Sequence, residues 1–233
     1  MKKKLLVIFM SLGLRGAFAE ESGLFVGFGG SFQTASKSVV SKVYNVDTAA
    51  NTVTLTSSNK DLSQNNSNYG GSFLIGYKYM FEELSGVRIY LNYDYNAIKL
   101  KKENSAEAQN SNYQILGLNL DYLYNFVDGF GFFLGTNFGA MNWDKNLHGE
   151  INQYNMYFAP QLGLRTSFAQ HSLELFAKFP LISTDTITKS NPEQITVNNQ
   201  KVTAWKNTKE VELKPNYNIG LRYIFTFWLV KPF

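Results

Sequence analysis

Histidine is the side chain most often used as a general base near neutral pH, and this 233-residue chain contains two of them. His148 stands beside Glu150 and near Asp144, a grouping that could activate a hydroxyl for attack on an ester. His171 stands in a short polar link. Both histidines fall in connections that we expect to be solvated, so the sequence predicts no catalytic residue. Two separated histidines without ligand spacing also predict no metal site and no cofactor.

A second set of reactive groups consists of charged side chains embedded in apolar stretches. Each alternates with Leu, Phe, Tyr or Val, as residues on opposite faces of a strand do. The set is Lys78, Arg88, Asp94, Asp121, Arg165, Glu174, Lys178 and Arg222. We expect these groups to neutralise one another inside a closed structure. Basic residues exceed acidic ones by five to three, so the alternative is a narrow path for anions.

The N-terminus has the features of a secretory signal peptide. Lys2, Lys3 and Lys4 precede an apolar run over residues 5–14, and the small residues Ala17 and Ala19 supply a cleavage site. A transmembrane helix needs roughly 20 apolar residues, so this run is too short to be an anchor. We expect cleavage after Ala19, which assigns residues 1–19 to the signal and 20–233 to the exported protein.

Removing this leader changes the charge of the chain. The leader holds four of the 22 basic residues and none of the 18 acidic ones, so 18 of each remain. The exported protein is formally neutral, which removes the electrostatic basis for binding nucleic acid. Cysteine is absent, so no disulfide framework stabilises the fold.

Eight later segments alternate apolar residues with polar or small ones over about 10 residues, which is the pattern of strands in an outer-membrane barrel. The segments are 24–33, 71–81, 87–99, 113–126, 130–143, 154–167, 172–179 and 217–227. Lipid offers no partner to backbone N–H and C=O groups, so such strands must close on themselves. The sequence therefore predicts an all-β fold, an eight-stranded antiparallel transmembrane β-barrel.

The links between these segments alternate in length. Short links follow the second, fourth and sixth strands, and long polar links follow the first, third, fifth and seventh. With an even number of strands both chain ends lie in the periplasm, so the long links are extracellular. The predicted extracellular loops are 34–70, 100–112, 144–153 and 180–216, and a tail covers 228–233. Parts of the first and last loops are rich in β-forming residues, so the adjoining strands are expected to extend beyond the membrane.

A soluble eight-stranded barrel that holds a ligand is the main structural alternative. In such a barrel the apolar face would point inward and the polar face outward. Here one face of the strands carries charged residues such as Arg88, Asp121 and Glu174, while the other face consists of Leu, Phe, Tyr and Val. The sequence favours the membrane barrel, with aromatic girdles at its rims.

The last strand carries the pattern polar-x-Gly-x-x-aromatic-x-aromatic, typical of barrel assembly signals. Its members are Asn218, Gly220, Tyr223 and Phe225. Recognition of such a signal by the barrel assembly machinery would proceed by pairing with the edge of the strand. The sequence therefore predicts that machinery as a partner.

Several motifs together resemble the Helicobacter outer-membrane proteins of the Hop and Hor type. They are Ile75-Gly-Tyr-Lys-Tyr-Met-Phe81, Val87-Arg-Ile-Tyr90, Tyr122-Leu-Tyr-Asn-Phe126, Phe130-Gly-Phe-Phe-Leu-Gly135 and Leu162-Gly-Leu-Arg-Thr166. The resemblance implies an outer-membrane location and a barrel formed by the C-terminal region of the family. The family contains adhesins and porins, and its known adhesins carry a large extracellular domain with no counterpart here.

An eight-stranded barrel is just wide enough for its own side chains, so an open pore is not expected. We expect a structural or adhesin-like protein that presents its loops, with Tyr44 and Trp205 as interaction candidates. The expected partners are outer-membrane lipids and lipopolysaccharide, and a host-cell or glycan ligand, with no nucleic acid. A narrow porin is the first alternative, and a lipid-modifying enzyme is the less favoured one.

Overall fold

The computed structural model describes residues 20, 22–64, 68–82, 84–101, 108–143, 154–197 and 200–228. These residues form ten strands of one sheet: β1 (Gly23–Asp47), β2 (Thr52–Gln64), β3 (Asn68–Met80), β4 (Ser85–Lys101), β5 (Ala108–Val127), β6 (Phe130–Trp143), β7 (Tyr154–Phe168), β8 (His171–Lys178), β9 (Thr184–Val197) and β10 (Gln200–Trp228). In this part of the chain we found no helix long and apolar enough to cross a bilayer.

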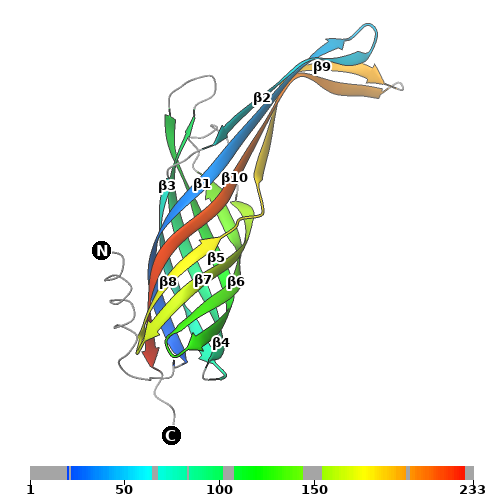
Figure 1. Ribbon diagram of the computed structural model, residues 1–233. Helices are drawn as coiled ribbons and strands as arrows, with labels where there is room; N and C mark the ends of the chain where they lie inside the picture. Colours follow the sequence, from blue (N-terminus) through cyan, green and yellow to red (C-terminus); the bar gives the residue numbers. More distant parts are fainter. Residues whose placement is uncertain are drawn as a thin grey trace.

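Eight of the described strands close into a ring. Neighbours pair in the order β1-β3-β4-β5-β6-β7-β8-β10, and β10 returns to pair with β1, every pair being antiparallel. Figure 1 shows the resulting barrel, with steeply tilted strands. The predicted eight-stranded transmembrane β-barrel is therefore confirmed. Closure pairs the backbone groups that lipid would otherwise leave without partners.

The alternation in the sequence maps onto the two faces of the barrel wall. Along β5, Leu118 and Leu120 are 48% and 57% exposed, whereas Asn119 and Asp121 are completely buried. The exposed apolar side chains form the lipid-facing surface, and the polar ones point inward. A soluble barrel with an apolar interior and a polar exterior does not fit this arrangement.

The short links form tight turns at one end of the barrel. β5 and β6 are joined by Asp128 and Gly129, and β7 and β8 by Ala169 and Gln170. Gly129 has φ +73°, a left-handed conformation that glycine adopts without a steric penalty. Ala169 lies in the same region, with φ +52°. These turns mark the periplasmic end.

The long first and last links differ from the loops that the sequence suggested. β1 and β10 continue as a paired ladder well beyond the barrel, from Gln33↔Asn218 to Val43↔Asn207. β2 pairs with the outer side of β1, and β9 with the outer side of β10. The extension of the first and last barrel strands agrees with the prediction. The second barrel strand is extended only slightly, since β3 begins at Asn68 and not at residue 71, and the seventh is not extended, because β8 ends at Lys178.

We call this four-stranded assembly the external sheet: β2, residues 36–47 of β1, residues 200–213 of β10, and β9. Figure 1 shows it projecting from one end of the barrel and dividing into two hairpins. The regions 34–70 and 180–216, predicted as loops, are thus largely strand. Polar strands of this kind lack the apolar face that marks a membrane-spanning strand.

The other predicted connections fall largely outside the described residues. β4 reaches Lys101 and β5 begins at Ala108, so the predicted loop 100–112 is shortened to residues 102–107, which are not described. The loop 144–153 also lies outside the described residues. Trp228, assigned to the tail, is the last residue of β10, and residues 229–233 are not described.

Candidate functional site

The structure places all eight of the predicted charged residues inside the barrel, each at most 5% exposed. They are Lys78, Arg88, Asp94, Asp121, Arg165, Glu174, Lys178 and Arg222. They come from six strands of the ring, and register brings partners together across neighbouring strands. Arg88 pairs with Asp121 between β4 and β5, and Glu174 pairs with Arg222 between β8 and β10.

Glu174 lies at the centre of the main ion-pair network. Its Oε1 and Oε2 accept hydrogen bonds from Arg88 Nη1 and Nη2 at 2.6 and 3.0 Å. Its Oε2 also accepts from Arg222 Nε at 2.5 Å, and Arg165 Nε lies 3.7 Å from Oε1. One buried carboxylate therefore contacts three arginines, two of them through charge-assisted hydrogen bonds.

Asp121 supplies a second negative charge to the same network. Its Oδ2 accepts from Arg88 Nε at 2.8 Å and lies 3.6 Å from Arg222 Nη2. Gln161 Nε2 donates to Asp121 Oδ1 at 2.6 Å and lies 2.9 Å from the Tyr90 hydroxyl, which also accepts from Arg222 Nη1 at 3.0 Å. These contacts fix the guanidinium groups in one orientation.

Inward aromatic rings fill the space around the arginines. Arg222 lies over the rings of Phe133 and Phe176, at 4.5 and 5.2 Å from their centroids. Arg88 lies 4.8 Å from the centroid of Phe133. Aromatic faces attract a cation and exclude water from it. The periplasmic half of the barrel is therefore filled by side chains.

The pair of Lys178 and Asp94 forms a separate contact. Lys178 Nζ donates to Asp94 Oδ2 at 2.7 Å, away from Glu174. On β10, Asn218 pairs in register with Lys178 and donates to Gln33 Oε1, which also accepts from the Tyr113 hydroxyl at 2.7 Å. The charged residues identified in the sequence thus form two groups in the barrel.

Glu20 belongs to the interior, and the sequence analysis did not identify it. Its carboxylate pairs with Arg165, accepts from Lys78 Nζ at 2.7 Å, and accepts from Asn125 Nδ2 at 3.3 Å. These partners lie on β7, β3 and β5, so one side chain joins three strands at the periplasmic end. The excess of five basic over three acidic residues was the signal that a further acid was needed.

The contacts of Glu20 change its protonation equilibrium. Burial would raise the pKa of this carboxyl, but Arg165 and Lys78 outweigh burial and lower the pKa from 4.5 to about 2. Because the pKa is lower in the folded state, the stabilisation is fully present above pH 4.5 and is lost as the pH falls toward 2.

We expect Glu20→Gln to lower the free energy of unfolding at pH 7 by up to about 3 kcal/mol, the value that corresponds to this pKa change. The urea midpoint of the refolded protein, measured at pH 7 and pH 3, tests this. The variant should depend less on pH than the wild-type chain does. Ser22→Ala, which removes the acceptor for Met80 N, is the uncharged control. Equal pH dependence of wild type and Glu20→Gln would contradict the assignment.

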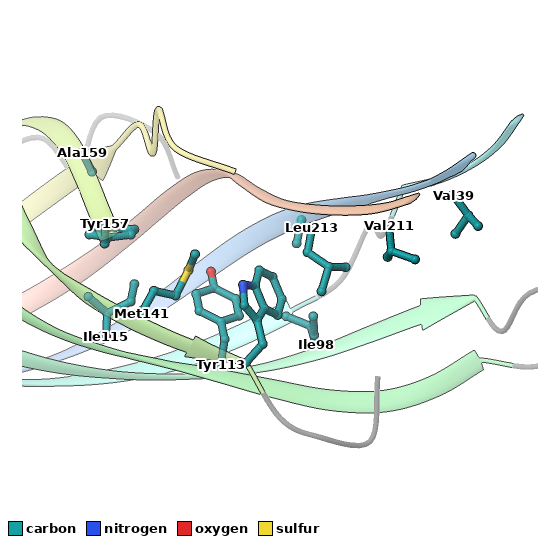
Figure 2. Packing of buried hydrophobic residues seen from close by; sticks show 11 residues of the cluster. Val39, Ile98, Tyr113, Ile115, Met141, Tyr157, Ala159, Val211 and Leu213 are labelled. Carbon is teal, nitrogen blue, oxygen red and sulfur yellow. The ribbon is translucent and has the colours of Figure 1, made fainter. Parts of the chain in front are cut away.

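An apolar cluster fills the extracellular half of the barrel. It consists of Ala35, Val39, Ile98, Tyr113, Ile115, Met141, Trp143, Tyr157, Ala159, Val211 and Leu213. Figure 2 shows these side chains running from the barrel interior to the base of the external sheet, where Val39 and Val211 pair across β1 and β10. The ring centroids of Tyr113 and Trp143 lie 4.6 Å apart. The cluster closes the barrel above the charged groups.

Neither histidine lies in a described catalytic arrangement. His171 begins β8 at the periplasmic end, where its Nδ1 lies 2.5 Å from the Tyr223 hydroxyl and its ring packs against Phe168 and Phe225. This is an interfacial aromatic cluster. His148 lies outside the described residues. Among the residues that the structure describes, no group of three or more His, Cys, Asp or Glu side chains could hold a metal ion.

The four residues of the predicted assembly signal lie within β10. Asn218 and Gly220 point inward, and Tyr223 and Phe225 lie on the lipid side near His171. Both edges of this stretch are occupied, by β1 and by β8. Pairing with another protein through this strand would therefore have to precede closure of the barrel.

The two interaction candidates lie at the outer end of the external sheet. Tyr44 pairs in register with Leu55, and Trp205 with Pro192. Both side chains are partly exposed. They come from different hairpins, and no described contact joins them.

The solved structures that resemble this chain include several outer-membrane proteins. The outer membrane protein OprG from Pseudomonas aeruginosa is 15% identical, with a TM-score of 0.42, and the match covers 90% of this chain and 99% of that one. The outer membrane protease OmpT from Escherichia coli is 8% identical, with a TM-score of 0.40 and coverage of 87% and 97%. The toluene transporter TodX from P. putida is 8% identical, with a TM-score of 0.23 and coverage of 89% and 91%.

At these identities the likeness carries no conclusion about ligand or reaction. No curated protein sequence matches the chain. A family model does match, over residues 72–227, which include most of β3, the ring strands β4 to β8 and the barrel part of β10, but not β1. The barrel, its apolar outer surface and this match together show that the chain is an outer-membrane protein and belongs to the Helicobacter outer membrane protein family.

Proposed function

We propose that the barrel serves as an anchor and that the external sheet binds an extracellular partner. The observation that carries this is the pairing of β1 with β10 from the membrane to Val43↔Asn207, broken by a single bulge between Thr34 and Ala35. A paired ladder holds its shape far better than a long loop, because its backbone groups are bonded to one another. The sheet therefore presents its outer end at a fixed height above the membrane.

The two hairpins at that end are also fastened to each other. Val46 of β1, Ile195 of β9 and Ala204 of β10 form a small buried apolar cluster. Thr196 N donates to Asn51 Oδ1 at 2.8 Å, which joins the end of β9 to the turn between β1 and β2. A surface ordered in this way binds a partner at a lower entropic cost than a flexible loop would.

The partner class that we propose is a glycan or another polar group on a host-cell surface. The outer end is rich in Asn, Ser and Thr, and Tyr44 and Trp205 add partly exposed aromatic surface. Tyrosine and tryptophan combine an apolar ring with a polar atom, which suits recognition of polar ligands at exposed sites.

Shortening both hairpins tests this proposal. The register allows the first hairpin to be cut at Val43↔Ser57 and the second at Asn207↔Ser190, each closed by an Asn-Gly turn. We expect the complete protein in lipid nanodiscs to bind a glycan array or an epithelial monolayer, and the shortened variant to lose this binding. Heat-modifiable gel mobility controls for an intact barrel. No binding by the complete protein, or equal binding by both, contradicts the proposal.

A narrow porin is the alternative, and the filled interior bears on it. Glu174, Asp121 and Glu20 neutralise the basic residues at the periplasmic end, and the apolar cluster closes the extracellular end. We therefore expect the purified protein to produce no conductance steps in planar bilayers. Reproducible anion-selective steps would instead favour the porin.

A further inference from the structure

The wall of the barrel contains one stretch where the ladder between neighbouring strands stops. β8 pairs with β10 from His171↔Phe225 to Lys178↔Asn218, and the ladder on this side of β10 resumes at Thr184↔Leu213 in β9. Between these points residues 179–183 face residues 214–217. We call residues 179–183 the strap and the boundary between the two segments the seam.

The strap is bonded on one side. Phe179 N donates to Pro160 O, and Leu181 N donates to Phe158 O, both at 2.9 Å, so the strap is held by β7. Within the described residues no backbone hydrogen bond joins the strap to residues 214–217. Pro215 has no N–H group, so residues 214–217 offer one backbone donor fewer.

The residues on either side of the strap are hydrogen-bonded to side chains in the barrel interior. Lys178, just before it, donates to Asp94 at 2.7 Å. Thr184, just after it, accepts a hydrogen bond from Trp143 Nε1 at 3.1 Å. The strap is therefore held at both ends and along its β7 edge, and its other edge is the seam.

Apolar side chains lie on both the lipid-facing and the inner face of the seam, although its β10 side also contains Lys214 and Asn216. Phe179, Leu181 and Tyr217 are exposed on the lipid side. On the inner side, Pro180 is buried, and it stands opposite Ala159 of the apolar cluster because the residues on either side of it bond to Pro160 and Phe158. Leu213, also in the cluster, pairs with Thr184 at the end of the seam. Backbone groups without partners are costly next to lipid, so a closed wall would be the expected arrangement here.

We propose that the seam is a lateral entry through which an acyl chain of a surrounding outer-membrane lipid reaches the apolar cluster. The acyl chain approaches from the hydrocarbon layer beside the exposed side chains of Phe179, Leu181 and Tyr217. Because the cluster is packed, the acyl chain enters by displacing side chains at its edge, and Met141, whose flexible thioether adapts to irregular shapes, is a side chain of the cluster that is able to move. The charged groups nearer the periplasm prevent the acyl chain from going further.

Trp143 is a built-in reporter, because it lies in the cluster and contacts the end of the strap. Replacing Trp205 and Trp228 by Phe leaves Trp143 as the one tryptophan of the chain. Bromine atoms on a lipid acyl chain quench tryptophan fluorescence on contact. We expect brominated phospholipid bilayers to quench Trp143, and acrylamide added from the water to leave its emission unchanged.

Locking the seam after folding provides the decisive comparison. The chain has no cysteine, so Leu181→Cys with Tyr217→Cys can be joined by a bifunctional thiol reagent. Leu175→Cys with Leu221→Cys, a paired position of β8 and β10, is the matched control in the closed ladder. We expect the seam lock to restore Trp143 emission to its level in unbrominated lipid, and the control lock to leave quenching unchanged.

Three results would overturn the lateral entry. They are absence of quenching by brominated lipid, equal quenching after both locks, and quenching by acrylamide in place of lipid. Quenching by acrylamide would show that Trp143 is reached from the aqueous end of the barrel and not from the lipid. None of them bears on binding by the external sheet, which is measured separately.

Discussion

Glu174→Gln is expected to be the most damaging of the charge substitutions in the barrel. The glutamine keeps the size of the side chain but removes the charge that three arginines share, Arg88 and Arg222 through hydrogen bonds and Arg165 at 3.7 Å. Removing one partner of a buried ion pair costs about 3–5 kcal/mol, because the remaining charge stays buried. With three arginines affected, we expect a loss of at least about 4 kcal/mol.

Refolding into detergent or lipid, followed by urea titration and heat-modifiable gel mobility, measures this effect. Glu193→Gln is the matched control, since Glu193 forms an exposed ion pair with Lys206 on the external sheet. An exposed pair contributes less than about 1 kcal/mol, so the control should unfold near the wild-type urea concentration. A Glu174→Gln barrel that also unfolds there would show that the arginines obtain their stabilisation elsewhere.

The barrel was predictable because its outer face is set by a simple physical requirement. Residues that face lipid must be apolar and residues that face the interior need not be, so β5 alternates Leu118 and Leu120 with Asn119 and Asp121. A strand cannot shift by one residue without reversing this pattern. Inward placement of Arg88 and Glu174 followed directly from their position in such strands.

Glu20 could not be found by the same reasoning, because it precedes β1 and belongs to no alternating segment. Its position depends on how the chain enters the first strand, with Ser22 Oγ accepting a hydrogen bond from Met80 N. Only the charge imbalance among the inward residues pointed to a missing acid. Local sequence patterns do not specify which distant carboxylate restores such a balance.

The apolar cluster was missed for a different reason. Tyr113, Ile115, Met141 and Trp143 occupy inward positions near the extracellular ends of β5 and β6, and the residues that alternate with them include Asn112, Gln114 and Asn142. The apolar face is here the inward one, so the rule that apolar residues of a barrel strand face lipid does not identify them. The strands β2 and β9 were assigned to loops, although parts of them are rich in β-forming residues, because neither has the continuous apolar face of a strand that contacts lipid.

These layers support the proposal that the external sheet, and not the barrel interior, binds a partner. The periplasmic end is closed by the ion pairs of Glu20 and Glu174, and the extracellular half by the apolar cluster. What the barrel leaves accessible is its lipid-facing wall and the sheet above it. A protein that conducted solutes would need neither a ladder as long as that of β1 and β10 nor a fastened outer end.

Gly135→Ala is expected to prevent correct closure between β5 and β6. A Cβ atom on Gly135 would lie 1.9 Å from Asp121 Oδ1 and 2.5 Å from Leu120 O. The carbonyl belongs to the β5–β6 wall and cannot move without separating the strands, since Gly135 pairs in register with Asp121. The carboxylate is held by Arg88 and Gln161, so displacing it would disturb the ion-pair network as well. Overpacking costs about 1–3 kcal/mol, and the two collisions place this variant at or above the upper limit.

Gly30→Ala is the control that separates this collision from a general effect of adding a methyl group. Gly30 lies in β1, and a Cβ there would meet no atom within 4 Å. Alanine also has a slight advantage in a strand because it loses less backbone entropy on folding. We therefore expect Gly30→Ala to refold and shift on gels like wild type, and Gly135→Ala to refold in low yield and unfold at lower urea. If both variants unfold at the wild-type urea concentration, the wall at Gly135 is able to widen, and the inward ion pairs then tolerate a displacement of Asp121. If only Gly135→Ala refolds in low yield, but its folded fraction keeps the wild-type urea midpoint, the close contact slows closure of the barrel and does not lower the stability of the folded protein.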